Sequence, residues 1–285
     1  MLHDFRESRR KSITDLYSKY HIPGRHLVLV GERVKVIIDP PSHYFGGPMR
    51  SDLRRYAKTL LIHGCEPPEI NNIQDNLIEH GARFTKIYTF DPVVQAAVAN
   101  SELFCFGSCW VTTDASGQLT ELQVNYSNKF STDKKFKVSF IRSSKQNLPG
   151  HQLRHDIGPL LDKQFNFEVY FPQQRIETKL PLFDDSMFHI AVENSRHPNY
   201  FTEKIIDCFM TYTVPIYWGS PNIGDYFNMR GVITFETTED LERILNSLTA
   251  EDYHSRLEAV KANREIAKAN YAFFFDRLNE YVRRL

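Results

Sequence analysis

The sequence has 285 residues, of which 41% are hydrophobic and 25% charged, as in ordinary soluble globular proteins. Lysine plus arginine and aspartate plus glutamate number 35 each, so no global positive field favours nucleic acid or anionic lipid. No apolar run approaches the roughly 18 residues of a membrane span, and the first 21 residues are too polar for a signal peptide. We therefore expect a cytoplasmic protein with no membrane span and one large or two modest domains.

The first half of the chain alternates strand-like and helix-like segments, which is typical of an α/β protein. Prolines and glycines between these segments mark the loops. Each strand–helix–strand step is expected to add a parallel strand. In chain order we predict a strand over 33–39, a helix-like segment over 50–64, a helix ending near Gly81, a strand over 86–89, a short helix after Pro92, and a strand with a turn over 102–111.

A polar stretch over 125–137 contains no long apolar run and is the best linker in the sequence. It divides the chain into an N-terminal domain, 1–130, and a C-terminal domain, 131–285. The second domain repeats the α/β pattern more regularly. Its predicted strands cover 137–144, 167–171, 187–194, 214–219 and 231–235, with helices over 151–165, from Thr202, over 239–248 and over 251–285.

Two Rossmann-like units facing a cleft, with bracing C-terminal helices, form the architecture of the GT-B glycosyltransferases, which this element order resembles. The four cysteines are Cys65, Cys105, Cys109 and Cys208, and they form no CxxC pair. We expect buried free thiols rather than a zinc site.

Polar residues gather in front of the helix that begins near Thr202. Glu193, Asn194 and Ser195 follow an apolar strand, at the strand end where open α/β sheets bind ligands. Thr202 can act as the N-cap. Lys204 then lies in the first turn, where a cation opposes the helix dipole, and a diphosphate nearby would offset that charge. The alternative is that Lys204 is a solvated surface residue.

The segment FHIAVENSRHPNYFTEKIIDCFMTYTVPIYWG, residues 188–219, resembles the donor-binding signature of family 10 glycosyltransferases, the α1,3/4-fucosyltransferases. Asn199 stands where the family usually has Asp, and Val192 where it usually has Phe. The matching residues are Glu193, Asn194, Ser195, Tyr200, Thr202, Glu203, Lys204, Val214, Pro215 and Gly219.

The resemblance implies a role in donor binding for several of these residues. Lys204 would hold the diphosphate, and Glu203 would accept hydrogen bonds from ribose or sugar hydroxyls. Asn194 and Tyr200 would contact the nucleotide sugar, although each could instead satisfy a loop backbone.

A second block, residues 137–160, is similar to the family's strand, polar loop and helix with a diphosphate-binding arginine. Arg154 is the expected arginine, because a guanidinium matches phosphate oxygens well. Arg142 and Lys145 could share this role. The alternative for Arg154 is a surface arginine paired along its helix.

On the acceptor side, HGCEPPEINNI (63–73) is similar to a family stretch in which a Glu precedes prolines. The family is inverting, so Glu66 is the expected general base, with Glu69 and His63 as substitutes and a solvated loop residue as the alternative. Asp184 and Asp185 are adjacent, but no DxD triplet precedes a metal site. We therefore expect no obligatory metal.

The predicted function is transfer of a sugar, fucose from GDP-fucose, to a carbohydrate hydroxyl. The same signature could serve another donor such as UDP-xylose, and the chain could instead be a catalytically silent carbohydrate- or nucleotide-binding protein. The sequence lacks GxGxxG, P-loop, HExxH and GxSxG motifs, which disfavours dehydrogenases, kinases and hydrolases. The expected partners are the nucleotide-sugar donor and a glycan acceptor. Neither the linkage nor the oligomeric state can be read from the sequence.

Overall fold

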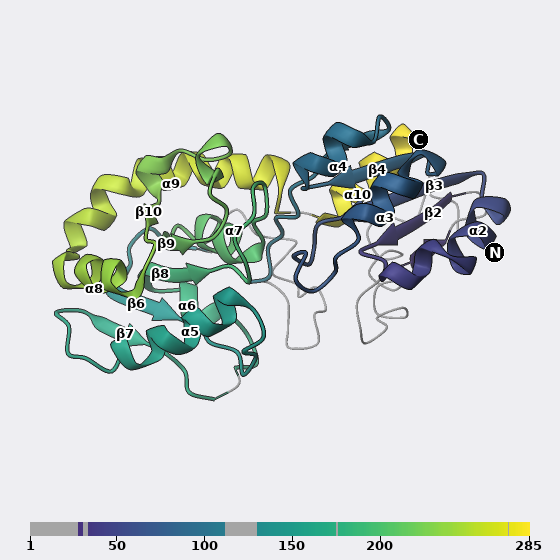
Figure 1. The fold of residues 1–285 in the computed structure, drawn as a ribbon. Helices are drawn as coiled ribbons and strands as arrows, with labels where there is room; N and C mark the ends of the chain where they lie inside the picture. Colours follow the sequence, from purple (N-terminus) through teal and green to yellow (C-terminus); the bar gives the residue numbers. More distant parts are fainter. Residues whose placement is uncertain (1–27, 31–33, 112–129, 175, 273) are drawn as a thin grey trace. The chain divides into compact units, whose positions relative to one another are not determined.

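A computed structural model describes residues 28–30, 34–111, 130–174, 176–272 and 274–285 (Figure 1). The chain divides into two compact units. Unit 1 contains the residues up to Phe106, Pro198–Tyr200 and Phe274–Leu285, and unit 2 contains Gly107–His197 and Phe201–Phe273. Part of the predicted linker, residues 125–129, lies outside the described residues, so the predicted boundary near residue 130 stays a prediction.

Unit 1 is built on a five-stranded sheet in the order β1-β2-β3-β4-β5. The edge strand β1 is antiparallel to β2, and the remaining neighbours are parallel. The strands are β1 (Val28–Val30), β2 (Val34–Ile38), β3 (Lys58–His63), β4 (Lys86–Thr89) and β5 (Ser101–Leu103); the helices are η1 (Ser42–Phe45), α2 (Gly47–Arg55), α3 (Gln74–His80), η2 (Gly81–Arg83) and α4 (Pro92–Ala97).

The two faces of this sheet bury alternate residues of each strand, as the period of two requires. Ile37 packs in the core formed with α2, α3 and α4. Val36 and Ile38 pack on the opposite face, where α10 (Phe274–Arg284) contributes Phe274 and Leu278. The C-terminal helix therefore completes the core of unit 1, whereas the sequence assigned it to the C-terminal domain.

The helix-like segment predicted over 50–64 is in fact the second half of α2 followed by strand β3. The polar first part keeps its arginines on the helix, whereas the apolar KTLLIH stretch is almost fully buried in the sheet. Such a continuous apolar run is typical of an interior parallel strand. The prediction failed because only Tyr56 and Ala57 separate the helix from the strand, so the two elements read as one segment.

Unit 2 contains a fully parallel five-stranded sheet in the order β10-β9-β8-β6-β7. The strands are β6 (Lys135–Phe140), β7 (Glu168–Tyr170), β8 (Ser186–Val192), β9 (Val214–Trp218) and β10 (Ile233–Thr234). The helices are α5 (Pro149–Leu160), α6 (Leu180–Phe183), α7 (Glu203–Met210), η5 (Ile223–Asp225), η6 (Met229–Gly231), α8 (Thr238–Ser247) and α9 (Ala250–Asn270).

The chain of unit 2 winds in two directions from β6. It first places β7 on one side of β6 and then returns to place β8 on the other. The helices between these parallel strands lie on both faces of the sheet, with α5 on one face and α7, together with α9, on the other (Figure 1). The expected α/β fold with parallel sheets is confirmed, and the carboxyl ends of β6 and β8 form the switch point where such sheets bind ligands.

Candidate functional site

The residues that follow the central strand β8 anchor the start of helix α7. Glu193 is fully buried, and its carboxylate accepts hydrogen bonds from Thr202 N at 2.8 Å and Thr202 Oγ1 at 2.6 Å. Thr202 occupies the N-cap position with extended backbone angles, but its side chain makes no capping hydrogen bond. The hydroxyl donates to Glu193 instead. Thr202 is therefore at the predicted N-cap position, but the side-chain cap expected there is not formed.

Lys204 lies within the same group of charges. Its Nζ is 3.4 Å from Glu193 Oε2 and 3.3 Å from Glu203 Oε1, and it donates to Thr202 Oγ1 at 2.9 Å. Burial raises the pKa of Glu193. Burial also acts to raise the pKa of Glu203, but Lys204 and Lys179 outweigh it and hold that pKa below its usual range. The charge that offsets Lys204 is thus supplied by two protein carboxylates.

Lys179 extends this group along α7 and was missed by the sequence reasoning. Its Nζ lies 3.0 Å from Asp207 Oδ2 and 3.3 Å from Glu203 Oε1. Asp207 is fully buried and also accepts a hydrogen bond from Trp110 N at 2.7 Å. Burial opposes the charge on Lys179, but Asp207 and Glu203 raise its pKa above the usual range. The four-residue spacing of Glu203 and Asp207 was the signal that these carboxylates share a helix face.

Arg154 reaches from α5 to the carboxyl end of β8. Its Nε and Nη2 donate to Val192 O at 3.1 and 2.6 Å, and Nη2 also donates to Asn194 Oδ1 at 2.9 Å. Gly150 permits this approach: its N donates to Asn194 O at 3.0 Å, and a Cβ there would lie 1.7 Å from Glu193 O. Helix α5 therefore packs against the backbone that follows β8.

His151 lies on helix α5, one turn before Arg154, and was also missed by the sequence reasoning. It is 2% exposed, and its Nδ1 is 3.0 Å from Asn147 Oδ1. Burial, together with the positive charges of Arg154, Lys145 and Lys204, lowers the pKa of His151 to about 4. The ring is neutral near pH 7, and its one N–H, on Nδ1, donates to Asn147 Oδ1. The structure thus brings three predicted donor-binding residues into the electrostatic surroundings of one histidine.

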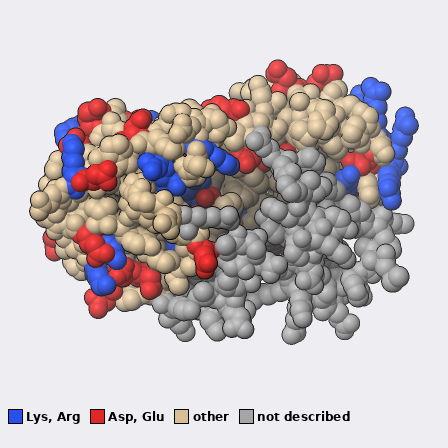
Figure 2. Space-filling view, turned by 90° about the horizontal axis from the view of Figure 1, so that it is seen from below, with Lys and Arg blue, Asp and Glu red and all other residues tan. Residues whose placement is uncertain are grey.

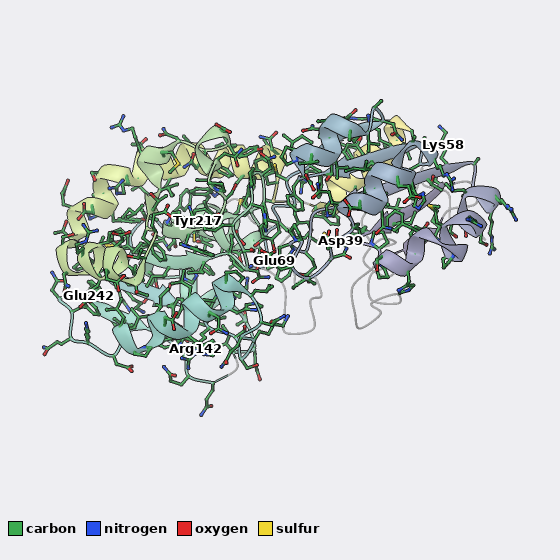
Figure 3. The ribbon with its side chains drawn as sticks, in the orientation of Figure 1. Asp39, Lys58, Glu69, Arg142, Tyr217 and Glu242 are labelled. Atoms are coloured by element: carbon green, nitrogen blue, oxygen red, sulfur yellow. The ribbon has the colours of Figure 1, made fainter. Side chains whose placement is uncertain are left out.

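Arg142 lies beside a different part of α5 (Figure 3). Its guanidinium is 5.2 Å from the centre of the Phe171 ring and packs against Gly158, where a Cβ would lie 2.7 Å from Nη1. These contacts place Arg142 beside the C-terminal half of the helix.

Tyr200 belongs to the short segment Pro198–Tyr200 that packs as part of unit 1. It is 1% exposed, and its ring lies 5.5 Å from that of Phe90. The preceding Asn199 has a φ of 64° and donates from Nδ2 to Phe90 O at 2.9 Å. An ionised aspartate could not make this hydrogen bond, which gives a physical reason for Asn199 where the family usually has Asp.

Close packing explains why the signature has a glycine at position 219. A Cβ at this position would lie 2.2 Å from Tyr217 Oη and 2.5 Å from Glu193 Cγ. Tyr217 is itself buried, and its hydroxyl accepts a hydrogen bond from Ser220 N at 3.0 Å. The strand end after β9 therefore fits closely against Glu193.

The acceptor-side residues lie in unit 1. Glu66 is half-buried in the turn after β3, and Glu69 is exposed further along the loop. His63 is 1% exposed, its Nδ1 is 3.0 Å from Thr89 Oγ1, and burial lowers its pKa to about 4. His63 is therefore enclosed by the sheet, whereas Glu66 keeps contact with solvent.

A hollow on α2 is lined by Gly47, Arg50, Ser51, Arg54 and Arg55, at the right-hand edge of unit 1 where Lys and Arg side chains gather in Figure 2. It contains none of the predicted site residues. Within the described ranges, no three His, Cys, Asp or Glu side chains are grouped so as to hold a metal ion. None of the helices in these ranges has the length and apolar character needed to cross a bilayer.

A parallel sheet with charged side chains at its switch point has the arrangement in which open α/β proteins bind ligands. More specifically, residues 131–258 match the family model described as glycosyltransferase family 10 (fucosyltransferase) C-term. The resemblance expected from the sequence is thereby confirmed over this part of the chain.

Individual relatives cover smaller stretches. Alpha-(1,3)-fucosyltransferase FucT of Helicobacter pylori is 30% identical over 71 residues, which are 25% of this chain and 15% of that protein. Alpha-(1,3)-fucosyltransferase B of Drosophila melanogaster is 30% identical over 118 residues, 38% of this chain and 26% of that protein. The matches thus span 26% or less of these relatives' own length. A crystal structure of an α1,3-fucosyltransferase with GDP-fucose has a TM-score of 0.47 at 14% identity, covering 90% of this chain and 96% of that chain.

Proposed function

We propose that this chain is an inverting glycosyltransferase that transfers fucose from GDP-fucose to a hydroxyl group of a carbohydrate acceptor. The observation that carries the proposal is that two cations converge on the residues after β8, inside the segment that matches the family. Arg154 Nη2 donates to Val192 O and Asn194 Oδ1, and Lys204 Nζ lies 3.4 Å from Glu193 Oε2. Cations at a sheet's switch point suit a ligand with two adjacent phosphates. GDP-fucose is the proposed donor because residues 131–258 match the fucosyltransferase family model.

Each donor-binding residue has a proposed task. Lys204 and Lys145 would contact the diphosphate as point charges. Glu203 stays ionised and would accept hydrogen bonds from ribose or sugar hydroxyls. Asn194 and Tyr200 would complete the contacts with the nucleotide sugar.

The role proposed for Arg154 differs from the diphosphate contact predicted from the sequence. Its hydrogen bonds to Val192 O and Asn194 Oδ1 give it a positioning role, because they fix the amide that would face the donor. Its charge still contributes to the potential felt by the diphosphate.

The reaction needs charge neutralisation on the departing diphosphate and removal of a proton from the attacking hydroxyl. The protein cations would serve the first need without an obligatory metal, and Glu66 would serve the second. The assignment of Glu66 rests on the family resemblance. Activity that survives EDTA would support the metal-independent proposal, and loss of activity on chelation would contradict it.

Donor identity can be tested with a thermal-shift panel of GDP, GDP-fucose, UDP and UDP-xylose. A ligand present at 100 times its Kd stabilises the folded state by about 2.7 kcal/mol. We expect a shift with GDP and GDP-fucose, and transfer of fucose when glycans are added. A shift with the UDP ligands alone would mean that the donor is a UDP-sugar and not GDP-fucose. Nucleotide binding without transfer to any of a panel of glycans would instead favour a catalytically silent binding protein.

A further inference from the structure

Asp39 stands at the end of β2 in an unusual backbone conformation. Its φ is 43°, it is 2% exposed, and its N donates to Ile62 O on the neighbouring strand β3 at 2.8 Å. Residues other than glycine rarely adopt a positive φ, and Asp and Asn are among those that tolerate it. The residue type and the conformation therefore agree, which makes the position of this carboxylate well defined.

The carboxylate of Asp39 binds three consecutive backbone N–H groups in the turn after β3. Oδ1 accepts from Gly64 N at 2.8 Å, and Oδ2 accepts from Cys65 N at 2.8 Å and Glu66 N at 3.0 Å. Hydrogen bonds to an ionised acceptor are stronger than those between neutral groups. One side chain thus fixes the backbone that leads into Glu66, at the carboxyl edge of the unit 1 sheet (Figure 3).

Holding the Asp39 carboxylate in this place has an electrostatic cost. Burial raises the pKa of Asp39 to about 6 against the three N–H groups that lower it, and the charge of Glu66 raises it further. Two carboxylates are therefore held near each other, where repulsion opposes ionisation of both. Local arrangements that work against stability are expected at functional or strained sites.

We infer that Asp39 is a positioning residue for Glu66, because its carboxylate fixes the Gly64–Glu66 backbone and thereby the direction in which the Glu66 side chain is presented. The inference rests on the proposed function, in which Glu66 accepts the proton of the acceptor hydroxyl. Asp39 itself would not touch the substrate.

Two substitutions at Asp39 test the effect of the carboxylate separately from the effect of the positive φ. Asp39→Gly keeps the positive φ without strain but removes every acceptor atom, whereas Asp39→Asn tolerates the same φ and keeps one acceptor oxygen. We expect Asp39→Gly to lower kcat at least about tenfold while the Kd for GDP changes less than about twofold. Asp39→Asn is expected to recover most of that loss. Thermal unfolding of both variants verifies that they are folded.

A double-mutant cycle with Glu66→Gln tests whether Asp39 acts through Glu66. Glu66→Gln is expected to lower kcat at least about 100-fold, the low end of the range for a general base. In that background Asp39→Gly is expected to cost less than about twofold more, since coupled residues are not additive. A full tenfold loss in the Glu66→Gln background, or wild-type kcat in Asp39→Gly alone, would overturn the inference.

Failure of the proposed function would look different. Near-normal kcat in Glu66→Gln, or no transfer by the wild-type protein, would remove Glu66 as the base and with it the proposed role of Asp39. Amide hydrogen exchange at Gly64, Cys65 and Glu66 then tests the structural step by itself. Exchange that is equally slow in the wild type and in Asp39→Gly would show that Asp39 does not hold the turn.

Discussion

Lys204 Nζ lies 3.4 Å from a carboxylate oxygen of Glu193, a side chain with no exposed surface at the end of the central strand. Glu203 adds a second carboxylate at 3.3 Å from the same ammonium group. Lys204 is therefore compensated by the protein itself before any ligand is present. A diphosphate would join an existing group of charges, so the effects of mutations on stability and on binding must be separated.

Lys204→Met is expected to weaken GDP binding at least about tenfold, since a charge-assisted hydrogen bond contributes about 1.5–3 kcal/mol. It also leaves the buried Glu193 without its cationic partner, at a cost of about 3 kcal/mol in the free energy of unfolding. Calorimetric titration with GDP and urea unfolding measure the two effects.

Two variants serve as controls for Lys204→Met. Glu193→Gln combined with Lys204→Met removes both charges and is expected to restore stability but not GDP affinity. Lys163 is exposed and pairs with Glu242, so Lys163→Met is expected to change the free energy of unfolding by less than about 1 kcal/mol and to leave binding unchanged. GDP affinity within twofold of wild type in Lys204→Met would remove Lys204 from the donor site.

Arg154→Lys distinguishes a positioning role from a purely electrostatic one. Lysine keeps the charge but cannot form the guanidinium fork that holds Val192 O and Asn194 Oδ1 together. We expect Arg154→Lys and Arg154→Ala each to weaken GDP binding at least about tenfold relative to the wild type. The affinities of the two variants are expected to lie within about threefold of each other. If calorimetry gives Arg154→Lys nearly wild-type affinity, the charge alone is sufficient and the positioning role is wrong.

The pH dependence of stability reports on His151. Its pKa is lowered to about 4 in the folded protein from 6.5, so between these values the unfolded chain binds the proton more readily. The contribution of His151 to stability is therefore complete above pH 6.5 and is lost as pH falls toward 4. The stability difference between wild type and His151→Gln is expected to shift by about 2 kcal/mol against the wild type from pH 7 to pH 5, at about 1.4 kcal/mol per pH unit. A difference that does not change with pH in urea unfolding would contradict the lowered pKa.

The strands were predictable wherever burial dictates the residue types. Strand β8 is buried along its whole length and reads as an apolar run, and β4 was placed at the residues predicted. The edge strand β1 has three residues and pairs antiparallel, which no local pattern indicates. Short edge strands depend on their partner more than on their own sequence.

The site was predictable in residue types but not in partners. The signature around Lys204 pointed to an anion. Nothing in the local sequence shows that Lys179 forms an ion pair with Asp207, because 28 residues separate them. The same holds for Asp39 and Glu66, which lie 27 residues apart on neighbouring strand ends. Such pairs are created by the parallel sheet, and only the strand order brings them together.

Gly219→Ala tests the close fit between the ends of β9 and β8. The added Cβ would lie 2.2 Å from Tyr217 Oη and 2.5 Å from Glu193 Cγ, so the buried tyrosine and glutamate must move. Overpacking of this kind costs about 1–3 kcal/mol in the free energy of unfolding. GDP affinity is expected to fall as well, because Glu193 anchors Thr202 and Lys204. Gly47→Ala is the matched control, since a Cβ at Gly47 meets nothing within 4 Å and alanine favours its helix. Equal unfolding free energies for the two variants would mean that the strand ends have room to separate and that the glycine of the signature is not required by packing.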